Sequence, residues 1–96
     1  MSRSAAMHAS SRELDKFFGA LSDGTRRGIL QILATGEHHV GEIVAKFNLA
    51  QPTISRHLSV LDSADLVRAE RRGQRVFYSL ERGTLEAVAK RFFGKF

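Results

Sequence analysis

Residues 40–62 constrain the fold most, because two short helical patterns follow each other there across a tight break. The first pattern has the i, i+3, i+4, i+7 spacing of one helix face and consists of Val40, Ile43, Val44 and Phe47. Pro52 then suits the first turn of a second helix, where its missing N–H is not needed. The second helical stripe consists of Ile54, Leu58 and Leu61.

Polar residues lie off the second stripe and would face solvent or a ligand. They are Thr53, Ser55, Arg56, His57 and Ser59. Small hydroxyls with an arginine and a histidine on an exposed helix are typical of a helix that enters the DNA major groove. The stretch therefore predicts a helix-turn-helix.

The overall charge agrees with a nucleic-acid partner. The 96 residues carry a net charge of +5 and a calculated pI of about 10.5, while 43% of them are hydrophobic, enough for one small core. A merely basic protein is the alternative, since net charge governs association and not the fold.

The absence of cysteine excludes disulfides, thiolate metal sites and thiol redox sensing. No apolar run is long enough to insert into a membrane, and no secretory signal precedes the first helix, so we expect a cytoplasmic protein. Residues 1–10 are small and polar and form a flexible N-terminal segment, or else extend the first helix by a turn.

Flanking patterns complete one domain over residues 11–96. Helices are expected at residues 11–21 and at about 84–93. Between them, a second helix follows a cap at Ser22 or Asp23 and runs to about residue 34. Residues 67–72 and 75–80 predict two strands around Gly73 and Gln74. The fold expected is mostly α with a small two-stranded β-hairpin, a winged helix-turn-helix of order α-α-α-α-β-β-α.

Two arginines, Arg26 and Arg27, fall in the first turn of the second helix, the unfavourable end of its dipole. They are either solvated or paired with Asp23, or they contact phosphate.

Aromatic residues gather in the terminal helices, where five of the seven Phe residues lie: Phe17, Phe18, Phe92, Phe93 and Phe96. A domain this small hides them with difficulty, and exposed apolar area usually marks an interface. We expect a homodimer surface made of Leu14, Phe17, Phe18, Leu85, Val88, Phe92 and Phe93. The alternative is that these residues close the monomer core. A twofold dimer would place two recognition helices about one DNA turn apart on a palindromic operator.

With these motifs in order, the chain resembles winged helix-turn-helix repressors of the ArsR/SmtB family, closest to the SdpR-like autorepressor branch. The resemblance spans about residues 14–93 and rests on 20–33, 49–67 and 71–80. It implies a dimeric repressor that binds double-stranded DNA. The positions that match DNA-facing residues of the family are Gln51, Thr53, Ser55, Arg56 and His57 on the recognition helix, and Arg72, Gln74 and Arg75 on the wing.

Two departures from the family pattern stand out. Gly24 replaces a usual proline, which makes the start of the second helix less rigid. Ala50 replaces a serine that commonly caps the recognition helix, and the lost cap costs ~1 kcal/mol.

The DNA-facing residues differ in what they can read. Arg56 either makes a bidentate contact with guanine, worth about 1–3 kcal/mol of discrimination, or clamps a phosphate. Gln51 reads adenine or bonds a phosphate, and Thr53 and Ser55 allow close approach. His57 donates to phosphate or packs against a neighbouring side chain. The wing arginines meet phosphates or a minor groove, or they form a solvated hairpin tip.

The sequence offers few residues that could bind a metal for sensing, and we expect no cofactor. Family members bind metal through the third or the last helix, where this chain offers no Cys and, on the last helix, only Glu86. His38 and His39 are adjacent and read better as exposed residues at a helix entry. A metal-responsive repressor using His and carboxylate ligands is the alternative function. Derepression would come from a sequestering protein partner or an apolar ligand between dimer helices, unless repression is constitutive.

No motif of an enzyme is present: the chain has no Cys nucleophile, phosphate-binding glycine loop, His-Glu-x-x-His or Gly-x-Ser-x-Gly. A protein-interaction module built on the aromatic helices is a third class, against which the hairpin and its arginines argue. The sequence therefore predicts a sequence-specific, DNA-binding transcriptional repressor that acts as a homodimer.

Overall fold

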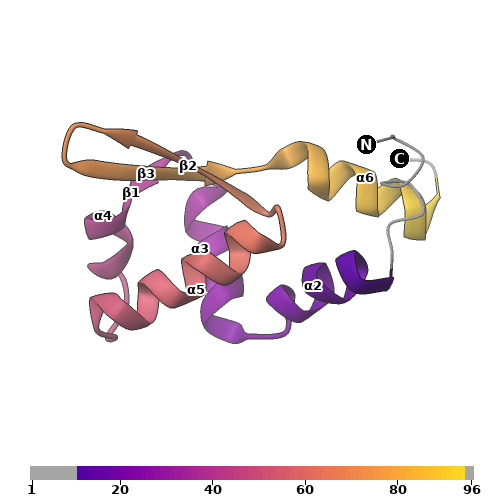
Figure 1. The fold of residues 1–96 in the computed structure, drawn as a ribbon, viewed down its shortest axis with the longest axis horizontal. Coiled ribbons are helices and arrows are strands. Elements are labelled where there is room, and N and C mark those ends of the chain that lie inside the picture. The colour runs from indigo at the N-terminus through magenta and orange to yellow at the C-terminus, as the bar shows by residue number, and fades with distance from the viewer. Residues whose placement is uncertain (1–10, 95–96) are drawn as a thin grey trace.

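The computed structural model describes residues 11–94 (Figure 1). Its elements in chain order are α2 (Ser11–Leu21), α3 (Gly24–Leu33), β1 (His38–His39), α4 (Val40–Val44), α5 (Gln51–Ser63), β2 (Val67–Arg72), β3 (Arg75–Leu80) and α6 (Arg82–Phe93). The expected flexible segment 1–10 and Phe96 lie outside the described residues.

The core forms where the apolar stripes of α3, α4 and α5 meet the root of the hairpin. Its most deeply buried large side chains are Ile29, Leu33, Ile43, Ile54, Leu58, Leu61, Leu66 and Val67. Burying one such side chain stabilises the fold by about 1.5–3 kcal/mol. The helical spacing predicted for α5 is confirmed, because its three stripe residues are all buried and its other side is left for a ligand.

The mostly helical, winged helix-turn-helix fold is confirmed, with one addition to the sheet. β2 and β3 pair as expected, from Val67 opposite Leu80 to Arg72 opposite Arg75, around a two-residue turn. Gly73 supplies the positive φ of 62° that such a turn needs.

The hairpin was predicted to have two strands, but the sheet has three, in the order β1-β3-β2. β1 pairs antiparallel with β3, His38 opposite Tyr78 and His39 opposite Phe77. Two residues are too few to show the alternation by which a strand is recognised in a sequence. The histidines expected at a helix entry therefore lie in a strand, and His39 is also the N-cap of α4.

The first helix of the helix-turn-helix is shorter than its apolar spacing suggested. α4 ends at Val44, and Phe47 lies in the following turn, where its ring still packs on the core. The ring sits against α3 at Gly28, where an added Cβ would lie 3.3 Å from Phe47 Cζ. α6 also differs, because it begins at Arg82, two residues before the expected Thr84.

The connection after α5 turns sharply. Asp65 has a φ of 63°, the Leu66 amide donates to Leu61 O at 2.9 Å, and the Asp65 amide donates to Asp62 O at 2.9 Å. These two bonds are the Schellman pattern, which satisfies carbonyls at a helix end. The turn buries Leu66 and directs the chain into β2.

The molecule is elongated, with extents of 38 × 28 × 24 Å. The wing tip lies at one end, and α2 and α6 lie toward the other, on the right of Figure 1. α6 has no fully buried residue, so one side of it is open to contact. Within the described part of the chain, no helix has the length and apolar character needed to cross a bilayer.

Candidate nucleic-acid interface

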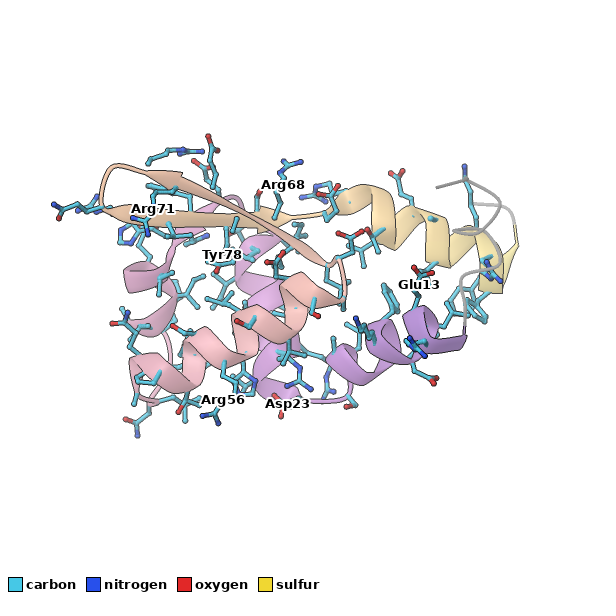
Figure 2. The ribbon with its side chains drawn as sticks, viewed as in Figure 1. Glu13, Asp23, Arg56, Arg68, Arg71 and Tyr78 are labelled. Carbon is cyan, nitrogen blue, oxygen red and sulfur yellow. The ribbon has the colours of Figure 1, made fainter. Side chains whose placement is uncertain are left out.

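The outer side of α5 carries four of the five recognition-helix residues predicted to face DNA. Gln51, Ser55 and Arg56 are exposed, and Thr53 is half-buried. Arg56 lies on the outer side of the helix (Figure 2). The buried stripe of α5 is on the opposite side, so the domain presents this face to a partner without rearrangement.

Ser59 belongs to the same face, although it was not among the predicted site residues. It is exposed and follows Ser55 by four residues and Arg56 by three. Residues at these spacings are neighbours on a helix surface. The helical spacing had already placed Ser59 among the residues that face solvent or a ligand, so we add it to the candidate site.

His57 is the predicted recognition residue whose contacts are inside the domain. Its side chain is only 17% exposed, and its Nδ1 lies 3.9 Å from the Asp23 carboxylate and 3.2 Å from Arg26 Nη1. Packing against a neighbour, one of the two alternatives for this residue, describes these contacts. A bond from its other nitrogen to phosphate stays a prediction.

Arg26 and Arg27 bind the end of the preceding helix. Arg26 donates from Nε to Ala20 O at 2.8 Å and from Nη2 to Gly19 O at 3.1 Å, and Arg27 donates from Nη1 to Leu21 O at 2.7 Å. These carbonyls end α2 and carry its negative dipole charge, which a cation stabilises. Both arginines thus have structural partners, which the sequence did not reveal.

Asp23 caps α3, as one of the two residues predicted for that position. Its carboxylate accepts the Arg26 backbone N–H at 3.1 Å. That bond is the largest cause of a lowered Asp23 pKa, and the nearby Arg26 charge adds to it. The cap is therefore negatively charged at neutral pH, and its carboxylate lies 3.9 Å from His57 in the middle of α5.

Arg72 of the wing is held by carboxylates of the protein itself. It donates to both oxygens of Glu37 at 2.7 and 2.8 Å and to Glu70 at 2.8 Å, and its Cζ lies 4.4 Å from the centre of the Phe77 ring. Hydrogen bonding to Arg72 lowers the pKa of Glu37, and the two carboxylates raise the pKa of Arg72. This arginine therefore links the hairpin to the residue that precedes β1.

The other two wing residues that were predicted to face DNA are exposed. Gln74 and Arg75 lie at the predicted tip, and Arg71 is nearby, with a long 3.4 Å bond from Nη1 to Gly73 O. Figure 2 shows Arg71 and Arg68 along the hairpin. Arg71 was not included in the predicted site. Arg71 has no carboxylate partner among the described ion pairs, whereas Arg72 is paired with Glu37 and Glu70.

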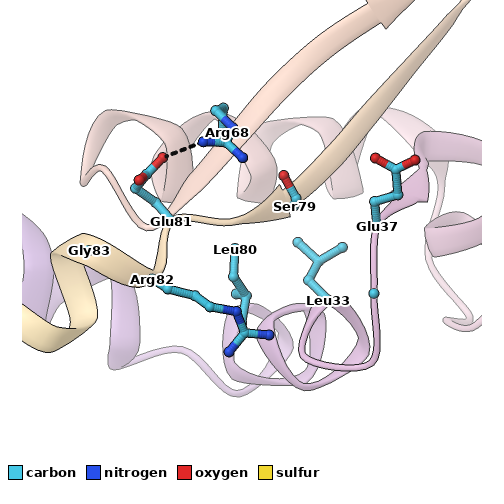
Figure 3. A pocket seen from close by; sticks show the side chains of 9 residues that line it. Leu33, Glu37, Arg68, Ser79, Leu80, Glu81, Arg82 and Gly83 are labelled. Carbon is cyan, nitrogen blue, oxygen red and sulfur yellow. Dashed lines mark ion pairs between the residues drawn. The ribbon is translucent and has the colours of Figure 1, made fainter.

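A hollow of about 350 Å³ lies behind the wing root, between the end of α3 and the start of α6 (Figure 3). Leu33 and Leu80 contribute apolar lining, and Arg68 and Glu81 form an ion pair of 3.5 Å across its edge. None of its lining residues comes from α5, so this hollow is separate from the DNA-facing side of that helix.

Both of the adjacent histidines have contacts within the domain. His38 Nδ1 donates to Gly36 O at 2.8 Å, and the His39 amide donates to Glu42 at 2.9 Å. The His39 ring meets Phe77 edge to face at 5.5 Å. Across residues 11–94, no three His, Cys, Asp or Glu side chains are grouped so as to hold a metal ion.

The aromatic residues predicted for the dimer surface divide into two groups. Phe17 is 6% exposed and belongs to the core, as the alternative reading had it. Phe18, Phe92 and Phe93 are 45%, 46% and 71% exposed. Phe18 packs edge to face on Phe17 at 5.2 Å and on Phe92 at 5.4 Å, so the patch joins α2 to α6. Leu85 and Val88, also predicted for the dimer surface, are partly buried and pack against the core, and Leu14 is partly buried.

Comparison with known proteins gives consistent matches. Residues 23–69 match the family described as bacterial regulatory protein, arsR family. The transcriptional repressor SdpR of Bacillus subtilis is 40% identical over 73 residues, which cover 76% of this chain and 81% of that protein. An arsenical resistance operon repressor of Staphylococcus aureus is 32% identical over 77 residues, covering 80% of this chain and 74% of the relative.

The fold has close structural neighbours as well. A crystal structure of an ArsR family transcriptional regulator superposes with a TM-score of 0.80 at 27% identity, covering 88% of this chain and 87% of that one. A second crystal structure, of a possible transcriptional regulator for arsenical resistance, gives a TM-score of 0.74 at 32% identity over 82% of this chain and 81% of the other. The residues matched by the family, 23–69, include the helix-turn-helix.

Proposed function

Because this chain belongs to the ArsR family of DNA-binding transcriptional regulators, we propose that it represses transcription as a homodimer on a palindromic operator. The family and the relatives are transcriptional regulators and not enzymes. The observation that carries the proposal is the exposed outer face of α5, where Arg56 and small hydroxyls stand opposite a buried apolar stripe. A repressor of this kind acts in the cytoplasm, where bacterial DNA lies.

Recognition of sequence is assigned to α5. Arg56 is long enough for a bidentate contact with guanine O6 and N7, while Ser55 and Ser59 flank it with short side chains that permit close approach. Gln51 and Thr53 lie in the first turn of the helix, near the positive end of its dipole, and contact phosphate or the first base. Phosphate bonds there fix the register, and Arg56 supplies specificity.

The wing is assigned to the flanking backbone of the DNA. Arg75, Gln74 and Arg71 are its exposed polar groups, and cations of this kind bind phosphates with a strong dependence on salt. We assign Arg72 to holding the wing against the body, because its guanidinium already donates to Glu37 and Glu70.

Dimerisation is assigned to the patch formed by Phe18, Phe92 and Phe93 on α2 and α6. Three half-exposed or exposed phenylalanines on one small domain make an apolar surface that water disfavours. A twofold contact through this patch buries it against its own copy. Each copy then offers one α5, which accounts for a palindromic site.

Repression without metal sensing is the remaining part of the proposal. The chain has no cysteine, His38 is bonded to the backbone, and His39 lies against Phe77. Zinc titrated into the protein at neutral pH should give no stoichiometric heat of tight binding, and operator affinity should not change. Tight binding of one zinc ion per protomer with loss of operator binding would instead establish the metal-responsive alternative.

The direct test is selection of DNA from a random duplex library, followed by footprinting on the selected site. We expect an inverted repeat with half-sites about one helical turn apart. Arg56→Ala should weaken binding and relax preference at one base pair per half-site, a loss of about 1–3 kcal/mol.

A matched control is Arg82→Ala, which removes an exposed cation from the start of α6. It should leave the preferred sequence unchanged. An equal loss on operator and random DNA for Arg56→Ala would assign this residue to phosphate and not to a base. Selection that yields no preferred sequence would contradict the proposed function itself.

A further inference from the structure

Arg26 connects three separate parts of the domain through one side chain. It starts in the first turn of α3, donates to the last carbonyls of α2 at Gly19 and Ala20, and reaches Nδ1 of His57 on α5 at 3.2 Å. The residue is partly buried, which restricts the guanidinium to this geometry. α2 belongs to the proposed dimer surface and α5 to the proposed DNA surface, so Arg26 lies between the two.

The hydrogen bond from Arg26 to His57 fixes the tautomer of the imidazole ring. A guanidinium has only donors, so Nδ1 of His57 must accept and cannot carry a proton. The neutral ring then holds its proton on Nε2. That N–H is the one polar donor the ring has left, and the side chain is still 17% exposed.

Asp23 completes the surroundings of the ring. Its carboxylate lies 3.9 Å from Nδ1 and accepts the backbone N–H of Arg26 at 3.1 Å. The same residue thus caps α3 and places the start of that helix, with Arg26, beside His57. Arg26 and Asp23 are the charged groups from α3 that face the ring.

We propose that Arg26 is a positioning residue for DNA binding: it sets His57 as an Nε2–H donor to a DNA phosphate and fixes α5 relative to the end of α2. This role rests on the proposed function, since it requires α5 to bind DNA. Three of the five N–H donors of Arg26 point at Gly19, Ala20 and His57, so we assign this side chain to positioning and not to DNA contact.

Arg27 provides a matched control in the same turn. It also donates to an α2 carbonyl, Leu21 O at 2.7 Å, but it has no contact with α5 among the described hydrogen bonds. Replacing either arginine by alanine removes one positive charge and bonding to the end of α2, two hydrogen bonds for Arg26 and one for Arg27. Only Arg26→Ala also releases His57.

The test is a double-mutant cycle of Arg26→Ala and His57→Ala, measured as affinity for the duplex selected by the wild-type protein. Arg26→Ala should weaken binding about three- to tenfold, the range of one lost hydrogen bond, and should have little further effect in the His57→Ala background. Arg27→Ala should change affinity by less than about twofold, a change no larger than that of an ordinary surface substitution. Thermal denaturation would confirm that each variant is folded.

Two replacements of His57 separate its two nitrogens. His57→Asn places an acceptor near the position of Nδ1 but lacks the outer donor, and His57→Gln keeps a donor near the position of Nε2. His57→Gln should retain more affinity than His57→Asn. The reverse order would overturn the assignment of the phosphate bond to Nε2.

A measurement on the wild-type protein keeps the proposal testable if Arg26→Ala does not fold. Long-range ¹H–¹⁵N NMR should find the neutral His57 ring protonated on Nε2 and unprotonated on Nδ1. The opposite tautomer would overturn the proposal, as would additive losses in the cycle while the wild-type protein binds its selected site. A wild-type protein that selects no DNA would instead contradict the proposed function.

Discussion

Arg72 and His57 show how a single residue can match a family position and still have partners inside the domain. Glu37 and Arg72 are 35 residues apart, and Arg26 and His57 are 31 apart. Contacts over such distances depend on the tertiary fold, so no local pattern predicts them. Arg56 and Ser55 were predictable because their exposure follows from helical spacing alone.

The pair of Glu37 with Arg72 should make the wing anchor sensitive to acid. The pKa of Glu37 is lowered in the folded protein, mainly by the hydrogen bonds from Arg72. The stabilisation is therefore fully present above the ordinary glutamate pKa and is lost as pH falls through the lower, folded value. A ¹³C titration of the Glu37 carboxyl should give a midpoint below that in the Arg72→Ala variant.

Replacement of the carboxylate gives the matching stability test. Glu37→Gln should flatten the fall of unfolding free energy between neutral and acidic pH, measured by urea denaturation. Glu86→Gln, an exposed change on α6, serves as the control and should leave the slope as in the wild type. A Glu37 midpoint that does not change in Arg72→Ala would show that the pair does not persist in solution.

Elements were predicted most accurately where apolar spacing repeats over several turns or several strand residues. The bounds of α2, β2 and β3 agree with the sequence pattern, because each has a long enough stripe or alternation. α4 was predicted too long, since Phe47 keeps helical spacing although the helix has already ended. β1 was missed because its pairing with β3 depends on the position of the hairpin and not on its own two residues.

The start of α5 carries a prediction at this scale. Ala50 has the extended backbone of an N-cap, with φ −70° and ψ 152°, but no side-chain hydrogen bond. Ala50→Ser should supply an acceptor for an amide of the first turn and raise the free energy of unfolding by about 1 kcal/mol. In a domain of this size the melting temperature would rise by about 4–8 °C.

Ala50→Val is the control, since it changes the side chain without adding an acceptor. It should give no stabilisation. If Ala50→Ser and Ala50→Val have the same melting temperature, the first turn of α5 is already satisfied by solvent and the missing cap has no energetic consequence.

The molecule as a whole has a polar face on α5 and the wing, and an aromatic end on α2 and α6. Phe92→Asp should convert the dimer to monomer at concentrations where the wild type is dimeric, because a charge would be buried against an apolar partner. Sedimentation equilibrium measures the change. Binding to a single half-site would persist weakly, while affinity for the full palindrome would fall to near that level.

Leu49→Asp is the matched control for that substitution. Leu49 is 40% exposed, close to the exposure of Phe92, but it lies in the turn before α5. It should leave the protein dimeric. Dissociation by both substitutions would indicate general destabilisation, and dissociation by neither would move the dimer contact away from the aromatic end.

The two-residue strand β1 has a mechanical consequence. It holds β3 only at Phe77 and Tyr78, and its second residue, His39, leads directly into α4. The hairpin is thus anchored to α4 through β1, and its exposed tip extends away from this contact. A displacement of the tip by bound DNA would therefore be transmitted through His39 to the first helix of the helix-turn-helix. The wing and the helix-turn-helix would then move together, so DNA contact made by one would affect the position of the other.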